Sequence, residues 1–265
     1  MPVANIAGVD IYYEVHGQGE PLVLVHHGTG STKMWEHLLP GFADKYRVIL
    51  YDRRGFGWSD KEGFRDYYKS AQYTTNSVRE LSILLEYLDI KDKVYILGQC
   101  EGGVIVVHFA ARYPDMVKAI AVSSTNCCDN AGTFRPSRPS QPSDRKGPPS
   151  FQDASQAYRD TLIRWQGEAY APELYALFVE KGGAYAAGPR PFDLRDTLKD
   201  VQCPALVLYP DRSHLFDVEQ AVLMYHALPR PTGELAVLPH CGHSAWLTQP
   251  EEYQRAILSF LARHS

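Results

Sequence analysis

The residues best suited to covalent chemistry lie in one short segment, Val94–Gly103, which reads Val-Tyr-Ile-Leu-Gly-Gln-Cys-Glu-Gly-Gly. The pattern predicts a strand over Val94–Leu97, a turn with glycines on both sides of Cys100, and an apolar helix over Val104–Ala111. A strand that turns sharply into a helix strains its middle residue and requires small neighbours. The middle side chain then projects above the sheet at the positive end of the helix. We therefore predict that Cys100 is a nucleophile with a thiol pKa lowered by the helix terminus, and the alternative is a small buried cysteine.

A histidine near the end of the chain is placed to activate this thiol. His243 follows a predicted strand in the segment Cys241-Gly242-His243, and an apolar segment, Ser244–Leu247, comes after it. The chain has 10 histidines, so a surface histidine is the alternative. An imidazole at this place could take the thiol proton and later protonate a leaving group. We predict His243 as the general base.

The elements that must position these two residues alternate along the chain. Apolar or alternating runs predict strands at Asp10–Val15, Pro21–His26, Arg47–Tyr51, Val94–Leu97, Ala119–Ser123, Val201–Tyr209 and Glu234–Leu238. Other segments predict helices at Trp35–Ala43, Thr74–Leu88, Val104–Ala111, Phe151–Phe178, Val218–Ala227 and Pro250–Arg263. The turn Gly17–Glu20 suggests that the first two strands form a hairpin. This order predicts an α/β fold with a mostly parallel, doubly wound sheet.

One segment interrupts this alternation between the strands predicted at Ala119–Ser123 and Val201–Tyr209. Asn126–Ser150 is rich in Pro and Ser and poor in apolar residues, so we expect an extended loop. An aromatic-rich helical stretch follows it. We predict a core of residues 1–125 and 192–265 and an insertion of residues 126–191. Such an insertion would cover the C-terminal ends of the strands, where ligands bind in these folds.

Composition excludes several classes of function. A hydrophobic fraction of 45% and a charged fraction of 22% are ordinary for a globular protein, and the net charge of −4 does not favour nucleic acid or anionic membranes. No apolar run approaches the roughly 18 residues of a membrane span, and Met1–Gly8 does not read as a signal peptide. The five cysteines lack metal-type spacing. We expect a cytoplasmic monomer or homodimer without metal or cofactor.

Several motifs in order resemble the α/β-hydrolase-fold superfamily. Gly98–Gly103 is similar to its nucleophile elbow, Gly-x-Ser-x-Gly-Gly, with cysteine in place of serine. His27-Gly28 resembles its oxyanion loop, Asp52–Asp60 its Asp-x-Arg-Gly-x-Gly-x-Ser-Asp loop, Ala110–Val117 the segment after the elbow helix, and Cys241-Gly242-His243 the segment that carries the catalytic histidine. The resemblance implies a single-domain α/β-hydrolase with a lid formed by the insertion. The loop Asp52–Asp60 is architectural in the family, so we assign it no chemical role.

The resemblance also implies the rest of the catalytic site. The oxyanion hole would consist of the backbone N–H groups of Thr29 and Glu101, and the side chain of Glu101 has no assigned role. The family's acid usually lies three residues beyond a glycine, but Pro210 replaces that glycine and Ser213 occupies the acid position. We assign Asp211 as the acid. A residue after the preceding strand (Asn126 or Asp129) and a plain Cys–His dyad remain alternatives.

These residues predict a hydrolase that attacks the carbonyl of a small ester, lactone or thioester. Cysteine-dependent members of the superfamily include dienelactone hydrolases, thioesterase-like enzymes and acyltransferases. An acyltransferase, a cyclase or a C–C bond hydrolase is therefore the first alternative. The second is a ligand receptor without catalysis, since the usual acid is displaced. The sequence leaves open which substrate is used and whether the acyl group passes to water.

Overall fold

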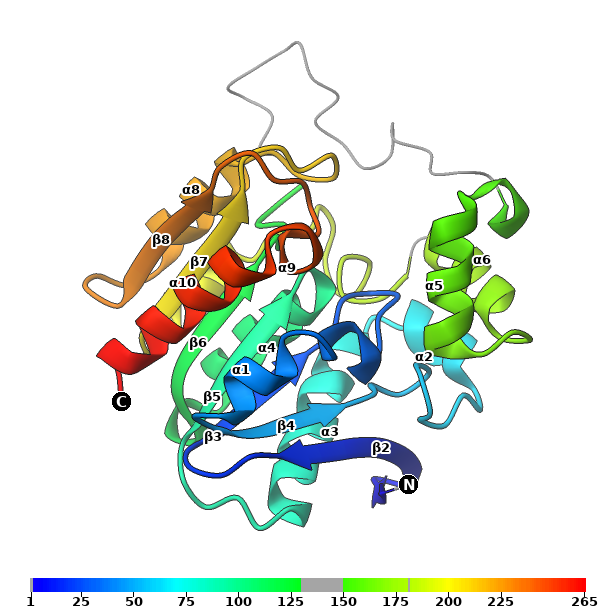
Figure 1. Ribbon diagram of the computed structural model, residues 1–265, viewed down its shortest axis with the longest axis horizontal. Coiled ribbons are helices and arrows are strands. Elements are labelled where there is room, and N and C mark those ends of the chain that lie inside the picture. Colours follow the sequence, from blue (N-terminus) through cyan, green and yellow to red (C-terminus); the bar gives the residue numbers. More distant parts are fainter. Residues whose placement is uncertain (1, 130–149, 181) are drawn as a thin grey trace.

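The computed structural model describes residues 2–129, 150–180 and 182–265. Most of the predicted extended loop, Asn126–Ser150, therefore lies outside the described residues. Eight strands form one sheet in the order β1-β2-β4-β3-β5-β6-β7-β8 (Figure 1). Their bounds are β1 Val3–Ile6, β2 Val9–His16, β3 Pro21–Val25, β4 Arg47–Tyr51, β5 Val94–Gln99, β6 Val117–Ser123, β7 Ala205–Pro210 and β8 Gly233–Leu238. All pairs from β4 to β8 are parallel, and the pairs β1–β2 and β2–β4 are antiparallel.

Helices cover both faces of this sheet. Their bounds are α1 Leu39–Ala43, α2 Phe64–Lys69, α3 Tyr73–Tyr87, α4 Glu101–Arg112, α5 Gln156–Gln166, α6 Ala171–Val179, α7 Arg195–Lys199, α8 Glu219–Ala227, α9 Ala245–Thr248 and α10 Pro250–Arg263, with short 3₁₀ turns at Thr32–Trp35, Pro114–Met116 and Phe151–Asp153. Successive strand residues face opposite layers. In β5, Val94 and Ile96 join the core under α3 and α4, and Tyr95 and Leu97 join the core under α10. This double burial explains why the parallel strands are apolar at nearly every position.

One predicted pairing is wrong. Gly17–Glu20 does connect β2 to β3, but the two strands do not pair, since β2 pairs with β1 and β4. Every residue of β3 is buried, and β3 lies between β4 and β5 in the parallel part of the sheet. The partly exposed strand β2 remains outside that part. The choice of neighbours for β3 is therefore determined by burial on both of its faces and not by its closeness to β2 in the sequence.

The helices α5 and α6 belong to the insertion between β6 and β7 and are drawn in green in Figure 1. Gly167, with φ of 90°, separates them. They enclose a small core of their own that contains Phe151, Leu162 and Tyr175. The Gln166 side chain fastens α5 to the loop after β3, because its Nε2 donates to the carbonyls of Thr29 and Gly30 at 3.0 and 2.8 Å. The division of the chain at residues 125 and 192 stays a prediction.

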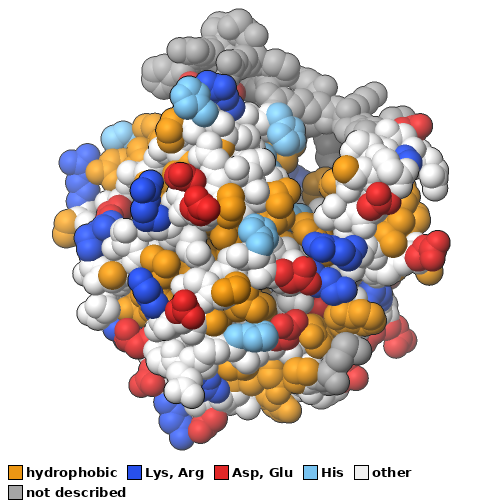
Figure 2. Space-filling view, viewed as in Figure 1, with side chains coloured by type: hydrophobic (Ala, Val, Ile, Leu, Met, Phe, Trp, Pro, Cys, Tyr) orange, Lys and Arg blue, Asp and Glu red, His pale blue; other side chains and the backbone are white. Residues whose placement is uncertain are grey.

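The surface carries mixed charge on the face that Figure 2 shows. Acidic and basic side chains are interspersed there, with apolar side chains between them. This pattern provides no single-sign field that would steer a highly charged partner to that face. Among the described residues, no helix is both long enough and apolar enough to cross a membrane.

Candidate active site

Cys100 lies at the sharp turn between β5 and α4. Its φ of 51° and ψ of −114° are strained for a residue with a side chain. The flanking glycines are needed because backbone crowds them: a Cβ at Gly98 would lie 2.6 Å from the carbonyl oxygen of Gly102, and a Cβ at Gly102 would lie 2.4 Å from that of Val25. The predicted strand, turn and helix are thus present, and the turn places Cys100 directly before the first residue of α4.

The thiol of Cys100 is partly exposed and has two hydrogen-bond donors. The hydroxyl of Tyr185 lies 3.6 Å from Sγ, and the backbone N–H of Glu101 also interacts with it. Burial nevertheless raises the pKa of the Cys100 thiol to about 12, although both of these hydrogen bonds act to lower it. The desolvation of a thiolate therefore outweighs the helix terminus, which by itself was expected to lower the pKa. Cys100 rests as a neutral thiol and needs a base.

The environment of His243, the predicted base, keeps its imidazole neutral. Burial, followed by the neighbouring His27 and His214, lowers the pKa of His243 to about 3. Its backbone carbonyl accepts a hydrogen bond from the Ser124 hydroxyl at 2.9 Å, and its ring lies against Phe216 at 5.8 Å between centroids. The imidazole is therefore neutral at neutral pH and has a lone pair for a proton.

The hydrogen-bond partner of the His243 ring is Ser213. The Ser213 Oγ lies 3.2 Å from Nδ1 of His243 and also accepts the backbone N–H groups of Leu215 and Phe216 at 3.3 and 3.2 Å. Serine thus occupies the family's acid position in space as well as in sequence. The third member of the site is a neutral hydroxyl group.

Asp211, the predicted acid, is placed differently. Its carboxylate accepts the backbone N–H of Cys241 at 3.1 Å, and hydrogen bonds from the amides of His240 and Cys241 lower its pKa. Asp211 directly follows β7, so its side chain joins the loop after β8, whereas Ser213, two residues further, reaches His243. In the structure the hydrogen-bond partner of the His243 ring is therefore Ser213, and Asp211 contacts the loop after β8. The assignment of Asp211 as the catalytic acid stays a prediction.

The two alternatives after β6 have other contacts. The backbone N–H of Asn126 donates to the hydroxyl of Tyr185 at 3.4 Å. Asp129 accepts the backbone N–H of Phe192 at 2.9 Å and lies 3.6 Å from Arg190. Both residues thereby join the segment that returns from the insertion to the core.

The loop after β3 supplies the other wall of the site through two histidines. Nε2 of the fully buried His26 accepts the backbone N–H of Arg53 at 3.1 Å, and its Nδ1 lies 2.8 Å from the carbonyl oxygen of His27. His27 lies against Trp165 and Trp246, with centroids 5.6 and 5.9 Å apart. His26 therefore shapes the loop, and His27 lines it.

The predicted oxyanion donors differ in their availability. The amide of Thr29 donates to Nδ1 of His27 at 3.2 Å, so it is already engaged. The amide of Gly28 has no acceptor among the described residues, which makes it the available donor of this loop. The amide of Glu101 begins α4, where helical N–H groups have no partner within the helix. The amide of Glu101 also interacts with the sulfur of Cys100. The predicted pair of donors, Thr29 and Glu101, stays a prediction, and Gly28 is a further candidate.

A buried ion pair connects the loop after β4 with the beginning of α4. Arg53 Nη1 and Glu101 Oε1 are 2.8 Å apart, and their side chains are 3% and 2% exposed. Tyr73 also donates to Glu101 at 2.9 Å, and Arg53 Nη2 donates to the carbonyl oxygen of His27 at 3.0 Å. No chemical role was predicted for either side chain. No sequence signal links them, because each alone resembles an exposed charge and 48 positions separate them.

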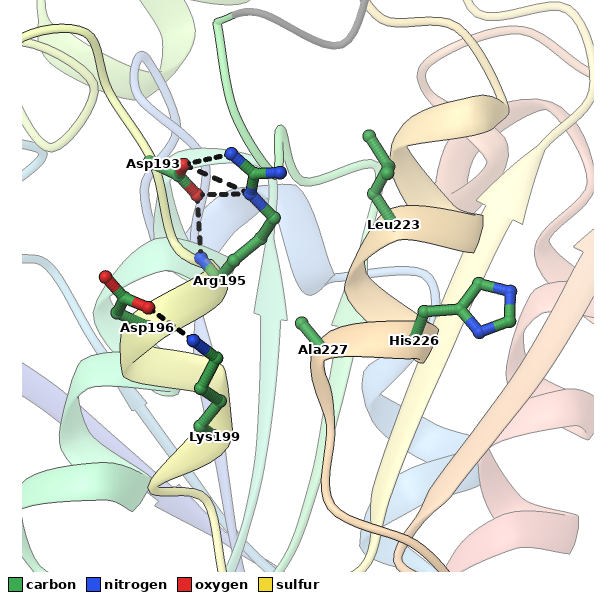
Figure 3. A pocket seen from close by; sticks show the side chains of 7 residues that line it. All are labelled: Asp193, Arg195, Asp196, Lys199, Leu223, His226 and Ala227. Atoms are coloured by element: carbon green, nitrogen blue, oxygen red, sulfur yellow. Dashed lines mark hydrogen bonds and ion pairs between the residues drawn. The ribbon is translucent and has the colours of Figure 1, made fainter.

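A separate hollow lies on the surface between α7 and α8 (Figure 3). It is lined by Asp193, Arg195, Asp196, Lys199, Leu223, His226 and Ala227. Its charged residues are already paired, Asp193 with Arg195 and Asp196 with Lys199. The candidate catalytic residues do not line it. Within the described part of the chain, no group of three or more His, Cys, Asp or Glu is placed to hold a metal ion.

Known proteins resemble this chain in sequence and in structure. The model of the alpha/beta hydrolase fold family matches residues 20–144. A 2-hydroxy-6-oxo-6-(2'-aminophenyl)hexa-2,4-dienoic acid hydrolase from Metapseudomonas resinovorans is 24% identical over 98% of this chain and 90% of its own length. A proline iminopeptidase from Lactobacillus delbrueckii subsp. lactis is 27% identical over 91% of this chain and 90% of its own length.

Solved structures show the same fold. A serine hydrolase involved in carbazole degradation has a TM-score of 0.76 at 23% identity and covers 98% of both chains. The enol-lactonase from Burkholderia xenovorans has a TM-score of 0.72 at 20% identity, over 98% of this chain and all of its own. The sheet order, the elbow and these similarities agree, and the relatives support a hydrolase. The protein has the α/β-hydrolase fold.

Proposed function

We propose that the protein is a hydrolase that attacks a carbonyl group of a small ester, lactone or thioester with Cys100. The observation that carries this proposal is the backbone of Cys100, held at φ 51° at the beginning of α4 between two glycines that cannot be replaced without a clash. Strain of this kind persists where the surrounding structure enforces it, and it clusters at functional sites. Here it presents a nucleophilic atom at a helix N-terminus.

The reaction begins from a neutral pair. His243 Nε2 takes the thiol proton while Sγ of Cys100 attacks the carbonyl carbon, and the negative charge on the carbonyl oxygen is held by the amides of Gly28 and Glu101. The imidazolium then protonates the leaving group, and a thioester remains on Cys100. Water, deprotonated by His243, attacks the thioester in turn. The C–S bond breaks, the acid leaves, and the sulfur regains its proton.

Ser213 orients His243 in this scheme. The general base needs its own proton on Nδ1, 3.2 Å from the hydroxyl oxygen of Ser213. That oxygen has two lone pairs, so it accepts the Nδ1 proton in place of one of its bonds from the amides of Leu215 and Phe216. A neutral hydroxyl stabilises the imidazolium less than a carboxylate would. A thiol is more acidic than an alcohol, so Cys100 requires less help from the base than serine would. The cysteine and the serine at position 213 are therefore compatible with each other.

The insertion is proposed to act as a lid that determines specificity. The hydroxyl of Tyr158 in α5 lies 3.4 Å from that of Thr29, and Trp165 lies against His27. These aromatic side chains from α5 reach the loop that would hold the carbonyl oxygen. They favour a substrate with an apolar part.

A C–C bond hydrolase is the second candidate. It is favoured by the relative named as a hexa-2,4-dienoic acid hydrolase, which matches nearly the whole chain. The same nucleophile, base and oxyanion hole can act on a ketone whose leaving group is a stabilised carbanion. An acyltransferase would use the same thioester with another acceptor, so the products separate the three activities.

The test is a panel of activated esters, lactones, thioesters and vinylogous diketones, assayed with the wild type, Cys100→Ala and Cys203→Ala. Cys203 lies before the N-terminal end of β7, whereas Cys100 follows the C-terminal end of β5, so its replacement is the matched control. We expect turnover to be lost in Cys100→Ala alone, and an acyl mass on Cys100 in the wild type. Unchanged turnover in Cys100→Ala would refute the proposal. A condensed product instead of free acid would indicate acyl transfer, and no turnover or adduct on the panel would favour the ligand receptor.

A further inference from the structure

We propose that Tyr185 is a further catalytic residue, whose hydroxyl donates a hydrogen bond to the sulfur of Cys100 when that sulfur carries negative charge. This inference rests on the proposed function, because it assigns a partner to the same nucleophile. Tyr185 belongs to the segment after α6, which returns from the insertion toward β7. The insertion would therefore supply a group to the chemistry as well as shape the pocket.

The position of Tyr185 is fixed from several sides. Its ring packs edge-on against Phe192, with centroids 5.2 Å apart and planes at 80°, and against Phe216 at 5.6 Å. Phe216 in turn lies against the His243 ring at 5.8 Å. The backbone carbonyl of Tyr185 accepts a hydrogen bond from Arg190 at 2.6 Å. One aromatic cluster thus joins the phenol of Tyr185 to the imidazole of His243 through Phe216.

The hydrogen-bond inventory determines what the hydroxyl of Tyr185 can donate to. The backbone N–H of Asn126 can only donate, so the oxygen of Tyr185 accepts it at 3.4 Å. The phenol proton remains for Sγ of Cys100 at 3.6 Å. Burial raises the pKa of Tyr185 well above its usual range, so the proton stays in place. Once His243 has removed the thiol proton, the sulfur can only accept, and Tyr185 is its side-chain donor.

This contact acts at two points of the reaction. During attack, it stabilises the charge that develops on Sγ as the proton moves to His243. During release of the acid, the C–S bond breaks and its electron pair returns to the sulfur, where Tyr185 again donates before the imidazolium returns the proton. Tyr185 keeps its own proton throughout, so the step needs no additional reactant.

The test measures the reactivity of Cys100 directly. Second-order rate constants for alkylation by iodoacetamide are measured as a function of pH, by mass spectrometry of the Cys100 peptide, for the wild type, Tyr185→Phe and Tyr209→Phe. Tyr209 is the matched control, because it is fully buried in β7 and its hydroxyl has no hydrogen-bond partner among the described residues. The charged groups that face the thiol, Glu101 and Arg53, are the same in all three proteins.

We expect Tyr185→Phe to slow alkylation about tenfold at every pH below the thiol pKa, since a hydrogen bond to a charged atom is lost. Tyr209→Phe should match the wild type. On a substrate, kcat of Tyr185→Phe should fall while KM changes little. A fluorotyrosine at position 185, which donates more strongly and keeps the ring, should speed alkylation instead.

A profile for Tyr185→Phe that superimposes on the wild type, or faster alkylation after loss of the hydroxyl, would overturn the proposal. This outcome is distinct from failure of the proposed function. Alkylation of Cys100 requires no substrate, whereas the proposed function fails when Cys100→Ala keeps its turnover.

Discussion

The two regions of the site around Cys100 differ in the charge that they bury. On the oxyanion side, formed by the loop after β3 together with Arg53 and Glu101, a full ion pair is buried. On the base side, formed by His243 and Ser213, the position of the family's acid holds a neutral hydroxyl. The buried carboxylate of Glu101 thus pairs with Arg53 rather than with His243. In the proposed mechanism, the ion pair fixes the backbone donors, and proton transfer relies on the acidity of a thiol.

The largest expected effect comes from removing the base. His243→Gln should lower kcat/KM by about 10³- to 10⁴-fold, the size of loss that follows removal of a residue from such a catalytic unit. Steady-state rates on the best substrate of the panel measure it. His214→Gln, which changes the neighbouring ring (5.9 Å between centroids), is the control and should cost far less. Equal losses in the two variants would remove His243 from the mechanism.

The oxyanion side should respond in stability. Arg53→Met leaves the carboxylate of Glu101 buried without its cation and should lower the free energy of unfolding by about 3–5 kcal/mol. The double variant Arg53→Met/Glu101→Met should recover most of that loss, because both charges are then gone. Urea denaturation of Arg53→Met, Glu101→Met and the double variant gives the coupling free energy between the two side chains. Losses that simply add would show that the two charges do not act as a pair.

Acid should lower the free energy of unfolding because the folded protein holds two histidines in their neutral form. His27 and His243 have pKa values of about 3 in the folded protein and about 6.5 in the unfolded chain. Below about pH 6.5 the unfolded chain takes up protons that the folded protein does not, so stability falls until the pH reaches the folded values. Each of the two contributes about 1.4 kcal/mol per pH unit within that window.

Denaturation between pH 7 and pH 4.5 checks this dependence. The slope of stability against pH for His27→Asn should be smaller than that of the wild type by the contribution of one histidine. If the two slopes were identical, the His27 imidazole would not be held neutral by its surroundings.

The smallest effect should come from Ser213. Ser213→Ala removes one neutral hydrogen bond to His243 and should cost about 1 kcal/mol in activation free energy, about fivefold in rate. Ser213→Asp should raise the pKa of His243, because a carboxylate would then face the ring, and should move the acidic limb of the pH–rate profile to higher pH. Profiles of kcat/KM between pH 4 and pH 8 measure both. An unmoved limb in Ser213→Asp would mean that position 213 does not orient the histidine.

Much of the fold could be predicted because burial leaves a direct pattern in the chain. Arg47–Tyr51 and Pro250–Arg263 have the predicted bounds, since a continuous apolar run and a regular apolar stripe are each hard to place otherwise. The pairing of β2 could not be read in the same way. The neighbour of β2 depends on which strands occupy the positions buried on both faces of the sheet. The amino-acid sequence does not indicate the order of the strands at those positions.

The parts of the site that could be predicted are those formed by residues close together in the sequence. Glycines at fixed offsets identified the turn at Cys100, but the available amide of the oxyanion loop depends on where the His27 side chain points. The ion pair of Arg53 and Glu101 joins distant segments. Tyr185 is one of 17 tyrosines in the chain, and only the fold brings its hydroxyl to the sulfur.

The buried pair of Arg53 and Glu101 also constrains how the chain can change over generations. Replacing either residue alone leaves a lone charge in the interior, so a lineage that loses the pair must pass through a poorly folded ancestor or change both codons together. Glu101 is constrained further, because its backbone N–H belongs to the proposed oxyanion hole and its side chain belongs to the ion pair. We expect the two residues to be inherited or lost together among close descendants of this chain. Their joint presence would mark the lineage more reliably than Cys100, which a single nucleotide change can convert to serine.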